Sequence, residues 1–273
     1  MKKFEVLCVT MGRKDFNLYN TMNLNSDVVF ANQCDNTMYS EKIIDGNKVK
    51  MISTETRGVG VNRNLAVMYA TAEICLMSDD DMVYRDGYEK LIIEEYERHP
   101  EADIIIFNIG TTTPEFGRIP TVTKKYKKLN TFSRCPYGAP RISFRLNSVK
   151  TSNIEFSTYF GGGCLYSNGE DSIWLSQMMN AGLKIYISPI FIGDVSYEQT
   201  TWEISDEGEK LYTKGAMYSA GRKKFKHLFV LYYSILKKYK NISPYNAWKL
   251  MQAGIKGYKT LKTYKEYKKG KNI

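Results

Sequence analysis

The chain has 273 residues, 43% of them hydrophobic and 25% charged, which is the composition of an ordinary soluble globular protein with a sizeable core. Its five cysteines are odd in number and widely spaced, and no two form a C-x-x-C pair. This argues against a disulfide framework or a structural zinc site and favours a reducing compartment. No stretch approaches the roughly 18 apolar residues that a membrane span needs.

The net charge of +10 is distributed unevenly along the chain. Residues 207–273 carry 17 Lys and Arg against 3 Asp and Glu, whereas residues 1–206 carry 22 against 26. We therefore expect a near-neutral body over 1–206 and a basic helical extension over 207–273. The N-terminus is basic, but its apolar run ends at Thr10 and no signal-peptide cleavage site follows, so we expect a cytoplasmic protein.

The body alternates strand-like and helix-like segments. Short apolar runs predict strands over residues 4–10, 27–31, 49–53, 74–77, 103–108 and 184–188, and regular structure at 141–146. Helical spacing of apolar residues predicts helices over 62–72, 88–98 and 172–181. This order is typical of an α/β fold with a mostly parallel sheet and helices on both faces. Ligands bind at the carboxyl ends of the strands in such sheets.

Two segments interrupt the alternation. Residues 111–140 hold four prolines and a basic patch without clear periodicity, and we expect an excursion from the sheet that includes an extended hairpin. Three glycines at 161–163 either make a tight bend or let the backbone approach a sugar closely. Glu170 and Asp171 then open the helix at 172–181, where carboxylates suit the helix dipole even without a catalytic role.

The basic extension is predicted to be helical and amphipathic. One stripe of apolar residues at helical spacing, bracketed by Lys and Arg, consists of Phe225, Leu228, Phe229, Tyr232, Ile235 and Leu236. A second helix begins near Tyr245. We expect the stripe and its basic rim to dock on the anionic inner face of a membrane, the alternative being a helix packed on the body with solvated lysines. Nucleic acid is not an expected partner, because no nucleic-acid module is recognised.

Three aspartates, Asp79, Asp80 and Asp81, directly follow the apolar run at 74–77. Adjacent carboxylates repel one another, and a hard divalent cation such as Mg²⁺ or Mn²⁺ relieves that repulsion. Such a cation is commonly held by one or two carboxylates together with substrate phosphates. A solvated acidic turn or a helix N-cap is the alternative, so the triplet alone leaves the function open.

Two longer motifs carry a family resemblance. The segment RGVGVNRNLAVMYATAEICLMSDDDM (57–82) resembles the donor-binding core of the inverting family 2 glycosyltransferases, which have the GT-A fold. The segment GEDSIWLSQMMNAGLKIYISP (169–189) resembles their E-D motif with its helix and next strand. Four further segments are similar to a branch that makes capsular and surface polysaccharides: TMGRKDF (10–16), NQCD (32–35), FGGGCLYSNGED (160–171) and TW (201–202). The resemblance implies a GT-A catalytic domain over 1–206.

The resemblance also implies how the donor would be bound. The donor would be a nucleotide-diphosphate sugar, for example a UDP-sugar, and it would be contacted by Thr10, Asp35, Arg57, Arg63 and Asp79. Mn²⁺ or Mg²⁺ would be held by Asp80 and Asp81 and would stabilise the leaving nucleotide. The common family pattern has an aspartate where this chain has Ser78, so which of the three aspartates binds the metal stays open.

On the acceptor side, the resemblance implies that Asp171 is the general base for the attacking hydroxyl and that Glu170 orients it or binds the acceptor. Gly162, Gly163 and Trp202 are the expected acceptor contacts. The acceptor would be a glycan, in particular a lipid-linked one. This suits a cytoplasmic enzyme that is peripheral at the inner face of the cell membrane.

Two other functions compete with this interpretation. A sugar-phosphate nucleotidyltransferase also uses a metal at a parallel sheet, and Gly12-Arg13-Lys14 faintly resembles its phosphate loop, but the E-D motif at 170–171 would then be unexplained. The second competing function is that of a non-catalytic protein that binds membranes or nucleic acid through its basic region. The sequence favours an inverting, metal-dependent GT-A glycosyltransferase of surface polysaccharide synthesis.

Overall fold

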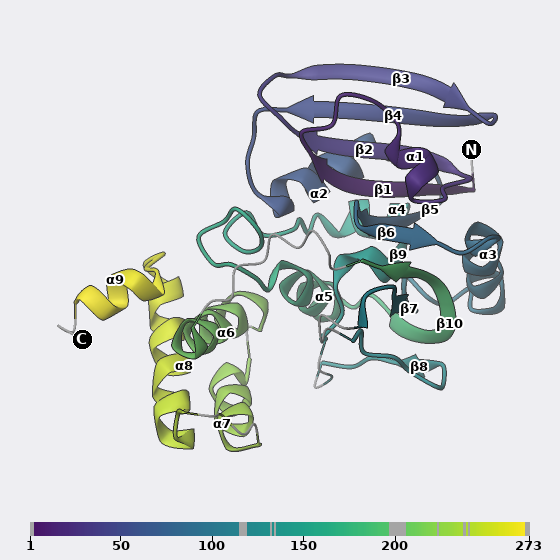
Figure 1. Cartoon of the computed structure of the whole chain (residues 1–273). Coiled ribbons are helices and arrows are strands. Elements are labelled where there is room, and N and C mark those ends of the chain that lie inside the picture. The colour runs from purple at the N-terminus through teal and green to yellow at the C-terminus, as the bar shows by residue number, and fades with distance from the viewer. Residues whose placement is uncertain are drawn as a thin grey trace.

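Figure 1 shows the computed structural model of the chain. It describes residues 3–114, 119–131, 133, 135–196, 206–222, 224–236, 239 and 241–270. A central sheet with helices against it forms the body, and the helices of the basic extension form a lobe at one side (Figure 1).

The sheet has ten strands within the described residues. They are β1 (Phe4–Met11), β2 (Asp27–Gln33), β3 (Met38–Ile44), β4 (Asn47–Thr54), β5 (Ile74–Asp79), β6 (Met82–Tyr84), β7 (Ile104–Thr111), β8 (Lys127–Lys128), β9 (Ile142–Arg145) and β10 (Ile185–Val195). They lie in the order β3-β4-β2-β1-β5-β9-β7-β10-β6, with β8 beside β10. Neighbours from β4 to β5 are parallel, as is the β7–β10 pair, whereas β3, β6, β8 and β9 pair antiparallel. The carboxyl ends of β1, β2 and β5 therefore share one edge.

Helices cover both faces of the sheet. They are α1 (Leu18–Thr21), α2 (Val59–Tyr69), α3 (Tyr88–Arg98), α4 (Leu146–Ser152), α5 (Glu170–Asn180), α6 (Glu207–Gly221), α7 (Lys226–Leu236), α8 (Pro244–Tyr258) and α9 (Tyr264–Lys269). Ala66, Val149 and Trp174 place α2, α4 and α5 in the core of one face. Tyr19 and Tyr88 place α1 and α3 in the core of the other. Because both faces are covered, every residue of β1 from Phe4 to Thr10 is buried, rather than every second one.

The strands and helices predicted for the body are present, with shifts of a few residues at their ends. The sequence missed β3, whose side chains are mostly exposed at the edge of the sheet, so that it carries no buried apolar run. It also ended the last strand too early. β10 continues through Pro189, and the shift in its register against β7 between Ile187 and Phe191 accommodates the proline.

The hairpin predicted within 111–140 is wrong for the described part of that segment. Its strand there is β8, whose two residues pair with β10 and not with a neighbouring strand of the same segment. The excursion is held to the body by side chains instead. Asn108 Nδ2 donates to the carbonyl of Thr123 at 2.8 Å, and Arg141 Nη1 donates to the carbonyl of Thr121 at 2.6 Å.

The basic extension folds onto the body. Leu211, Tyr212 and Met251 share a core with Phe160 and Ile173 of the body. Within the extension that was expected to be helical, the sequence located no individual helix before Phe225, whereas α6 begins at Glu207. Within the described residues, no helix has the length and apolar character needed to cross a membrane.

Glycines let α6 and α8 approach closely. A Cβ atom added at Gly254 would lie 1.9 Å from the Tyr212 carbonyl oxygen, and one added at Gly215 would lie 1.9 Å from that of Met251. We expect Gly254→Ala to lower the free energy of unfolding by about 1–3 kcal/mol, because the helices must separate. Urea unfolding measures this. Gly270→Ala is the matched control, since a Cβ atom there would lie 3.6 Å from the carbonyl oxygen of Glu266, and a loss equal to that of Gly254→Ala would contradict the close approach.

Candidate active site

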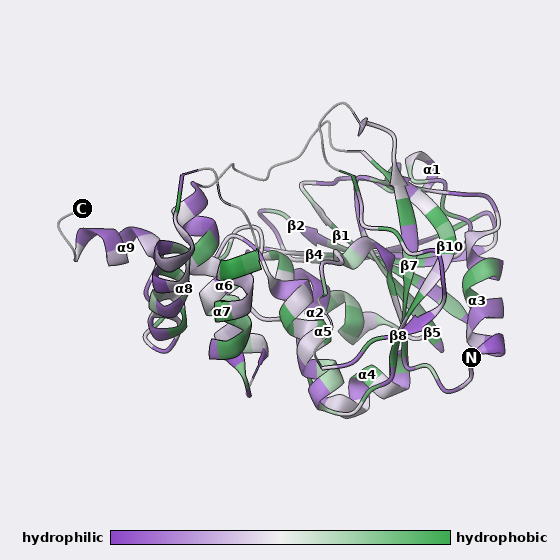
Figure 2. Ribbon diagram, turned by 90° about the horizontal axis from the view of Figure 1, so that it is seen from below, coloured by the Kyte–Doolittle hydropathy of each residue, from purple (hydrophilic) through white to green (hydrophobic). Residues whose placement is uncertain are grey.

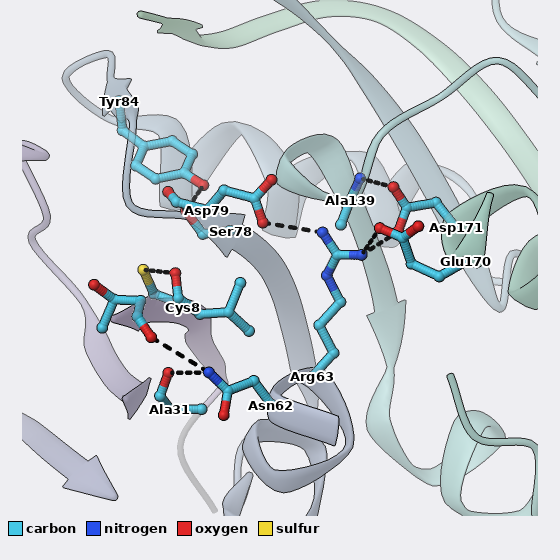
Figure 3. A network of polar contacts seen from close by, with 12 residues as sticks. Cys8, Ala31, Asn62, Arg63, Ser78, Asp79, Tyr84, Ala139, Glu170 and Asp171 are labelled. Atoms are coloured by element: carbon cyan, nitrogen blue, oxygen red, sulfur yellow. Dashed lines mark hydrogen bonds and ion pairs between the residues drawn. The ribbon is translucent and has the colours of Figure 1, made fainter. Parts of the chain in front are cut away.

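The acidic residues singled out in the sequence meet at the carboxyl edge of the sheet (Figure 3). Asp79 is the last residue of β5, which pairs in parallel with β1. Glu170 and Asp171 are the first residues of α5. The preceding Gly169 has a φ of 114°, a conformation that favours glycine, so the chain can turn sharply into the helix at this point. A strand end and a helix start thus bring carboxylates from distant segments together.

Arg63 of α2 joins these carboxylates (Figure 3). Its Nη2 donates to Asp79 Oδ1 at 3.1 Å. Its Nη1 donates to Glu170 Oε1 at 2.8 Å and to Asp171 Oδ1 at 2.5 Å. The guanidinium is buried and lies over the ring of Phe156, 5.6 Å from its centroid. One cation therefore serves three carboxylates that come from both predicted motifs.

The charges in this cluster are unbalanced. For Arg63, burial lowers the pKa, but Asp171, Asp79 and Glu170 outweigh burial, so the pKa is raised and the guanidinium stays charged. For Asp171, burial raises the pKa, and repulsion from Glu170 and Asp79 raises it further. The ion pair with Arg63 lowers it, and the net result is a pKa of about 8. The backbone N–H of Ala139 also donates to Asp171 Oδ2 at 3.0 Å, which fixes the second carboxylate oxygen.

The three consecutive aspartates have different partners. Asp79 is held by Arg63, as described. Asp80 Oδ2 accepts hydrogen bonds from Thr10 Oγ1 at 2.5 Å and from Arg13 Nη2 at 3.1 Å. Asp81 Oδ1 is buried, and no described residue donates a hydrogen bond to it. Burial, followed by repulsion from Asp79 and Asp80, raises the pKa of Asp81 to about 7.

This arrangement fits a hard divalent cation that is shared with a bound diphosphate. Among the described residues, no three His, Cys, Asp or Glu side chains are grouped to hold a metal on their own. Mg²⁺ sites commonly have one or two carboxylates and take their other ligands from substrate phosphates and water. A buried carboxylate oxygen without a donor is costly unless something positive binds it, so Asp81 is the aspartate best suited to the metal, with Asp80 beside it.

Two of the residues expected to contact the donor pair with each other. Arg57 Nη2 contacts Asp35 Oδ1 at 2.8 Å, and Arg57 Nη1 donates to the Cys34 carbonyl at 2.9 Å. Both side chains are exposed at the end of β2. Among the described residues, no hydrogen bond or ion pair joins this pair to the Arg63 cluster, so the two lie as separate groups along the same edge. Gln33 Oε1 accepts from the N–H of Gly58 and ties this rim to α2.

The glycine loop at 161–163 packs on the start of α2. Gly161 has a φ of 105°, and a Cβ atom there would lie 2.3 Å from Val59 and 2.8 Å from Glu170. The carbonyl of Gly162 accepts from the N–H of Val59 at 3.1 Å, and no described atom lies within 4 Å of a Cβ placed at Gly162. Gly163 is in ordinary contact with Gly58. Of the expected acceptor contacts, Gly162 thus borders open space, and Trp202 lies outside the described residues.

Four residues of this site were not assigned by sequence reasoning, namely Arg13, Asn62, Ala139 and Phe156. Arg13 also donates to Thr10, at 3.2 Å. Asn62 is buried, and its Nδ2 bridges the carbonyls of Thr10 and Ala31, which fixes α2 to the ends of β1 and β2. Arg13 and Asn62 lie inside quoted motifs, so their position was a usable signal, whereas nothing local marks Ala139 or Phe156.

Comparison with known proteins agrees with this geometry. A family model described as glycosyl transferase family 2 matches residues 17–160, more than half of the chain. Among solved structures, the chain is similar to S. aureus TarS 1-349 in complex with UDP-GlcNAc, with a TM-score of 0.63 and 14% identity over 99% of this chain and 92% of that one. The complex of the same TarS fragment with UDP gives a TM-score of 0.59 and 13% identity over the same shares.

At these identities the likeness to TarS shows the fold and not the substrate. A search of curated proteins found no match. The family match together with the α/β sheet flanked by helices nevertheless identifies the protein: it belongs to glycosyl transferase family 2 and is a glycosyltransferase with the GT-A fold.

Proposed function

We propose that this glycosyltransferase moves a sugar from a nucleotide-diphosphate donor to a hydroxyl of a surface or capsular glycan, with inversion and with a divalent metal. The observation that carries the proposal is the position of Arg63, which contacts Asp79 of the donor motif and Asp171 of the E-D motif at once. The UDP-GlcNAc and UDP complexes of TarS, which has the same fold, support a UDP-sugar as the donor.

On the donor side, Thr10, Asp35 and Arg57 lie along the carboxyl edge that would receive the nucleoside and diphosphate. Asp81 and Asp80 would hold Mn²⁺ or Mg²⁺. When bound, such a cation neutralises the negative charge that develops on the leaving diphosphate. Asp79 is kept out of this role by Arg63, which holds its Oδ1.

On the acceptor side, Asp171 acts as the general base. The acceptor oxygen forms its bond to the anomeric carbon while the bond from that carbon to the diphosphate oxygen breaks, and the electron pair leaves with the nucleoside diphosphate. The hydroxyl proton passes to Asp171. Attack from the face opposite the leaving group inverts the anomeric configuration. A base with a pKa near the working pH is well matched to this task, and burial moves the pKa of Asp171 in that direction.

Glu170 and the glycine loop complete the acceptor side of the proposal. Glu170 is buried, shares Arg63 with Asp171, and lies against Gly161. It would therefore position Asp171 and the loop, and Gly162 would border the acceptor. We further propose that the acceptor is lipid-linked and that the enzyme works in the cytoplasm, peripheral at an anionic membrane face. The strongly basic region 207–273 supports this location.

A panel of sugar nucleotides tests the proposed function. We expect the enzyme to turn over one donor with Mn²⁺ and to release a nucleoside diphosphate. The reaction should stop when the metal is chelated. Formation of a sugar nucleotide from a sugar phosphate and a nucleoside triphosphate would instead show a nucleotidyltransferase. If no donor turns over and none raises the melting temperature, the transferase reaction proposed here is wrong.

Asp81→Asn tests which aspartate holds the metal. We expect the Mn²⁺-dependent part of UDP binding to weaken by at least the ~10–100-fold that loss of an outer-shell partner costs, because the substitution removes the carboxylate charge. Calorimetric titration of UDP with Mn²⁺ and with chelator measures it. Asp45→Asn, in the exposed turn between β3 and β4, is the control. An Asp81→Asn protein that still needs Mn²⁺ to the same extent would exclude Asp81 as a ligand.

A further inference from the structure

Helix α7 has apolar side chains on two faces, and one of them is exposed. Val230 and Ser234 are buried toward the rest of the lobe, with Phe229 and Tyr233 partly buried beside them. The opposite side carries large apolar residues that are each 45–62% exposed, here called the outer face of α7: Leu228, Leu231, Tyr232, Ile235 and Leu236, together with Phe225, which directly precedes the helix.

The outer face is a continuous stripe and not a scatter of single residues. Positions 228, 231, 232, 235 and 236 recur at i, i+3, i+4, i+7 and i+8, which places them on one side of a helix. Contiguous apolar patches on soluble proteins mark sites that bind another protein, a membrane or a ligand. Figure 2 shows hydrophobic colouring on α7, in the lobe at the far side of α5 from the sheet. Packing of the lobe on the body uses the other face and leaves this stripe available.

Basic side chains surround the stripe. A groove between α7 and α8 is lined by His227, Leu228, Leu231, Trp248, Gln252 and Lys256. Lys249 is seven residues before Lys256, so both lie on the side of α8 that borders the groove, and both are exposed. Lys224, just before α7, is exposed too. An apolar stripe with a lysine rim is complementary to a surface that has an apolar interior and anionic headgroups.

We propose that the outer face of α7 is the surface that inserts into an anionic bilayer, with Lys224, Lys249 and Lys256 contacting the headgroups. This inference names the surface that would contact the membrane. It rests on the proposed function only in placing the enzyme at an anionic membrane face. A second copy of the chain fits the same stripe less well. It would bring two regions of the same sign together, each with 17 Lys and Arg against 3 Asp and Glu.

The test is sedimentation of the full chain with vesicles of phosphatidylglycerol and phosphatidylcholine. We expect binding to the anionic vesicles and not to pure phosphatidylcholine, with weakening at high salt. The Leu228→Ser, Ile235→Ser double variant should bind about a hundredfold more weakly, since burying each such side chain is worth about a factor of ten or more. The Lys249→Gln, Lys256→Gln variant should lose about fivefold for each lysine.

Ile43→Ser is the matched control, because Ile43 is on β3 and is 61% exposed, against 62% for Ile235. It should bind vesicles like the wild type. Circular dichroism confirms folding of each variant, and UDP titration in parallel separates docking from donor binding. Undiminished vesicle binding by the Leu228→Ser, Ile235→Ser variant, or no binding by the wild type, would overturn the proposal. A wild-type dimer that this variant dissociates, without vesicle binding, would assign the stripe to a second copy.

Discussion

Asp171→Asn is expected to reduce the turnover number by about 10²–10⁴, the usual contribution of a positioned general base. The amide has nearly the shape of the carboxylate and can still accept from the N–H of Ala139, but it cannot take a proton from the acceptor hydroxyl. Donor binding should change by no more than about twofold, because the loss is confined to the transition state. Steady-state kinetics and calorimetric titration of the donor measure the two quantities.

The control for this variant is Asp45→Asn, which changes an equally charged side chain away from the site. A second check is Asp171→Glu, which restores a carboxylate and should recover part of the activity. Turnover by Asp171→Asn at the wild-type rate would remove Asp171 from the role of base. Loss of donor binding equal to the loss of turnover would show that the substitution had disturbed the Arg63 cluster instead.

The pH profile of the wild type follows from the same residue. Because burial raises the pKa of Asp171 to about 8, we expect the proposed base to be mostly protonated in the free enzyme at neutral pH. We expect kcat/KM to rise with pH through this region and to fall on acidification, since only the ionised carboxylate accepts a proton. An acid limb of kcat/KM centred near ~4, where an exposed aspartate titrates, would contradict a raised pKa of Asp171 in the free enzyme, whereas such a limb in kcat alone would show that donor or metal binding restores the ordinary pKa.

Arg63→Leu is expected to lower the free energy of unfolding by about 3–5 kcal/mol, the cost of removing one partner from a buried ion pair. Glu170 and Asp171 would lose their shared cation, and Asp79 would lose its partner. The loss should be larger at pH 8 than at pH 5, because carboxylates without a cation take up protons at the lower pH. Urea unfolding at both pH values measures it.

Arg85→Leu is the matched control for Arg63→Leu. Arg85 pairs with Asp194 at 3.3 Å, but its side chain is 49% exposed, and pairs of this kind contribute about 0–1 kcal/mol. Arg63→Lys keeps the charge, but a lysine lacks the planar guanidinium that contacts both sides of the cluster. Its free energy of unfolding should therefore lie between those of the wild type and Arg63→Leu. Equal losses for Arg63→Leu and Arg85→Leu would show that the buried cluster adds no stability.

The order of strands and helices in the body could be predicted because it depends on periodicity within short windows. Apolar runs located β1, β2, β4, β5 and β7, and helical spacing located α2, α3 and α5. β3 was missed because an exposed edge strand needs no apolar run. The two motifs, read in order, also pointed to the fold and to the carboxyl edge of the sheet, and the family match confirms that fold.

The partners of the site residues could not be read from the sequence. Arg63 was expected at a diphosphate, yet it holds Glu170 and Asp171, which are 107 and 108 positions away. Which neighbours a buried charge finds depends on which strand ends and helix starts meet in the fold. Only the tertiary structure therefore distinguished the three aspartates by their partners.

The same limit applies to the basic extension. Its composition determined that it is positively charged, and its periodicity predicted an amphipathic helix that the structure has over Lys226–Leu236. Periodicity reports that a helix has an apolar stripe but not what covers it. Only the tertiary structure shows that α7 contributes Val230 to the core shared with α6 and α8 while Leu228 and Ile235 stay exposed, because the face that packs is selected by the neighbouring helices and not by the sequence of α7 alone.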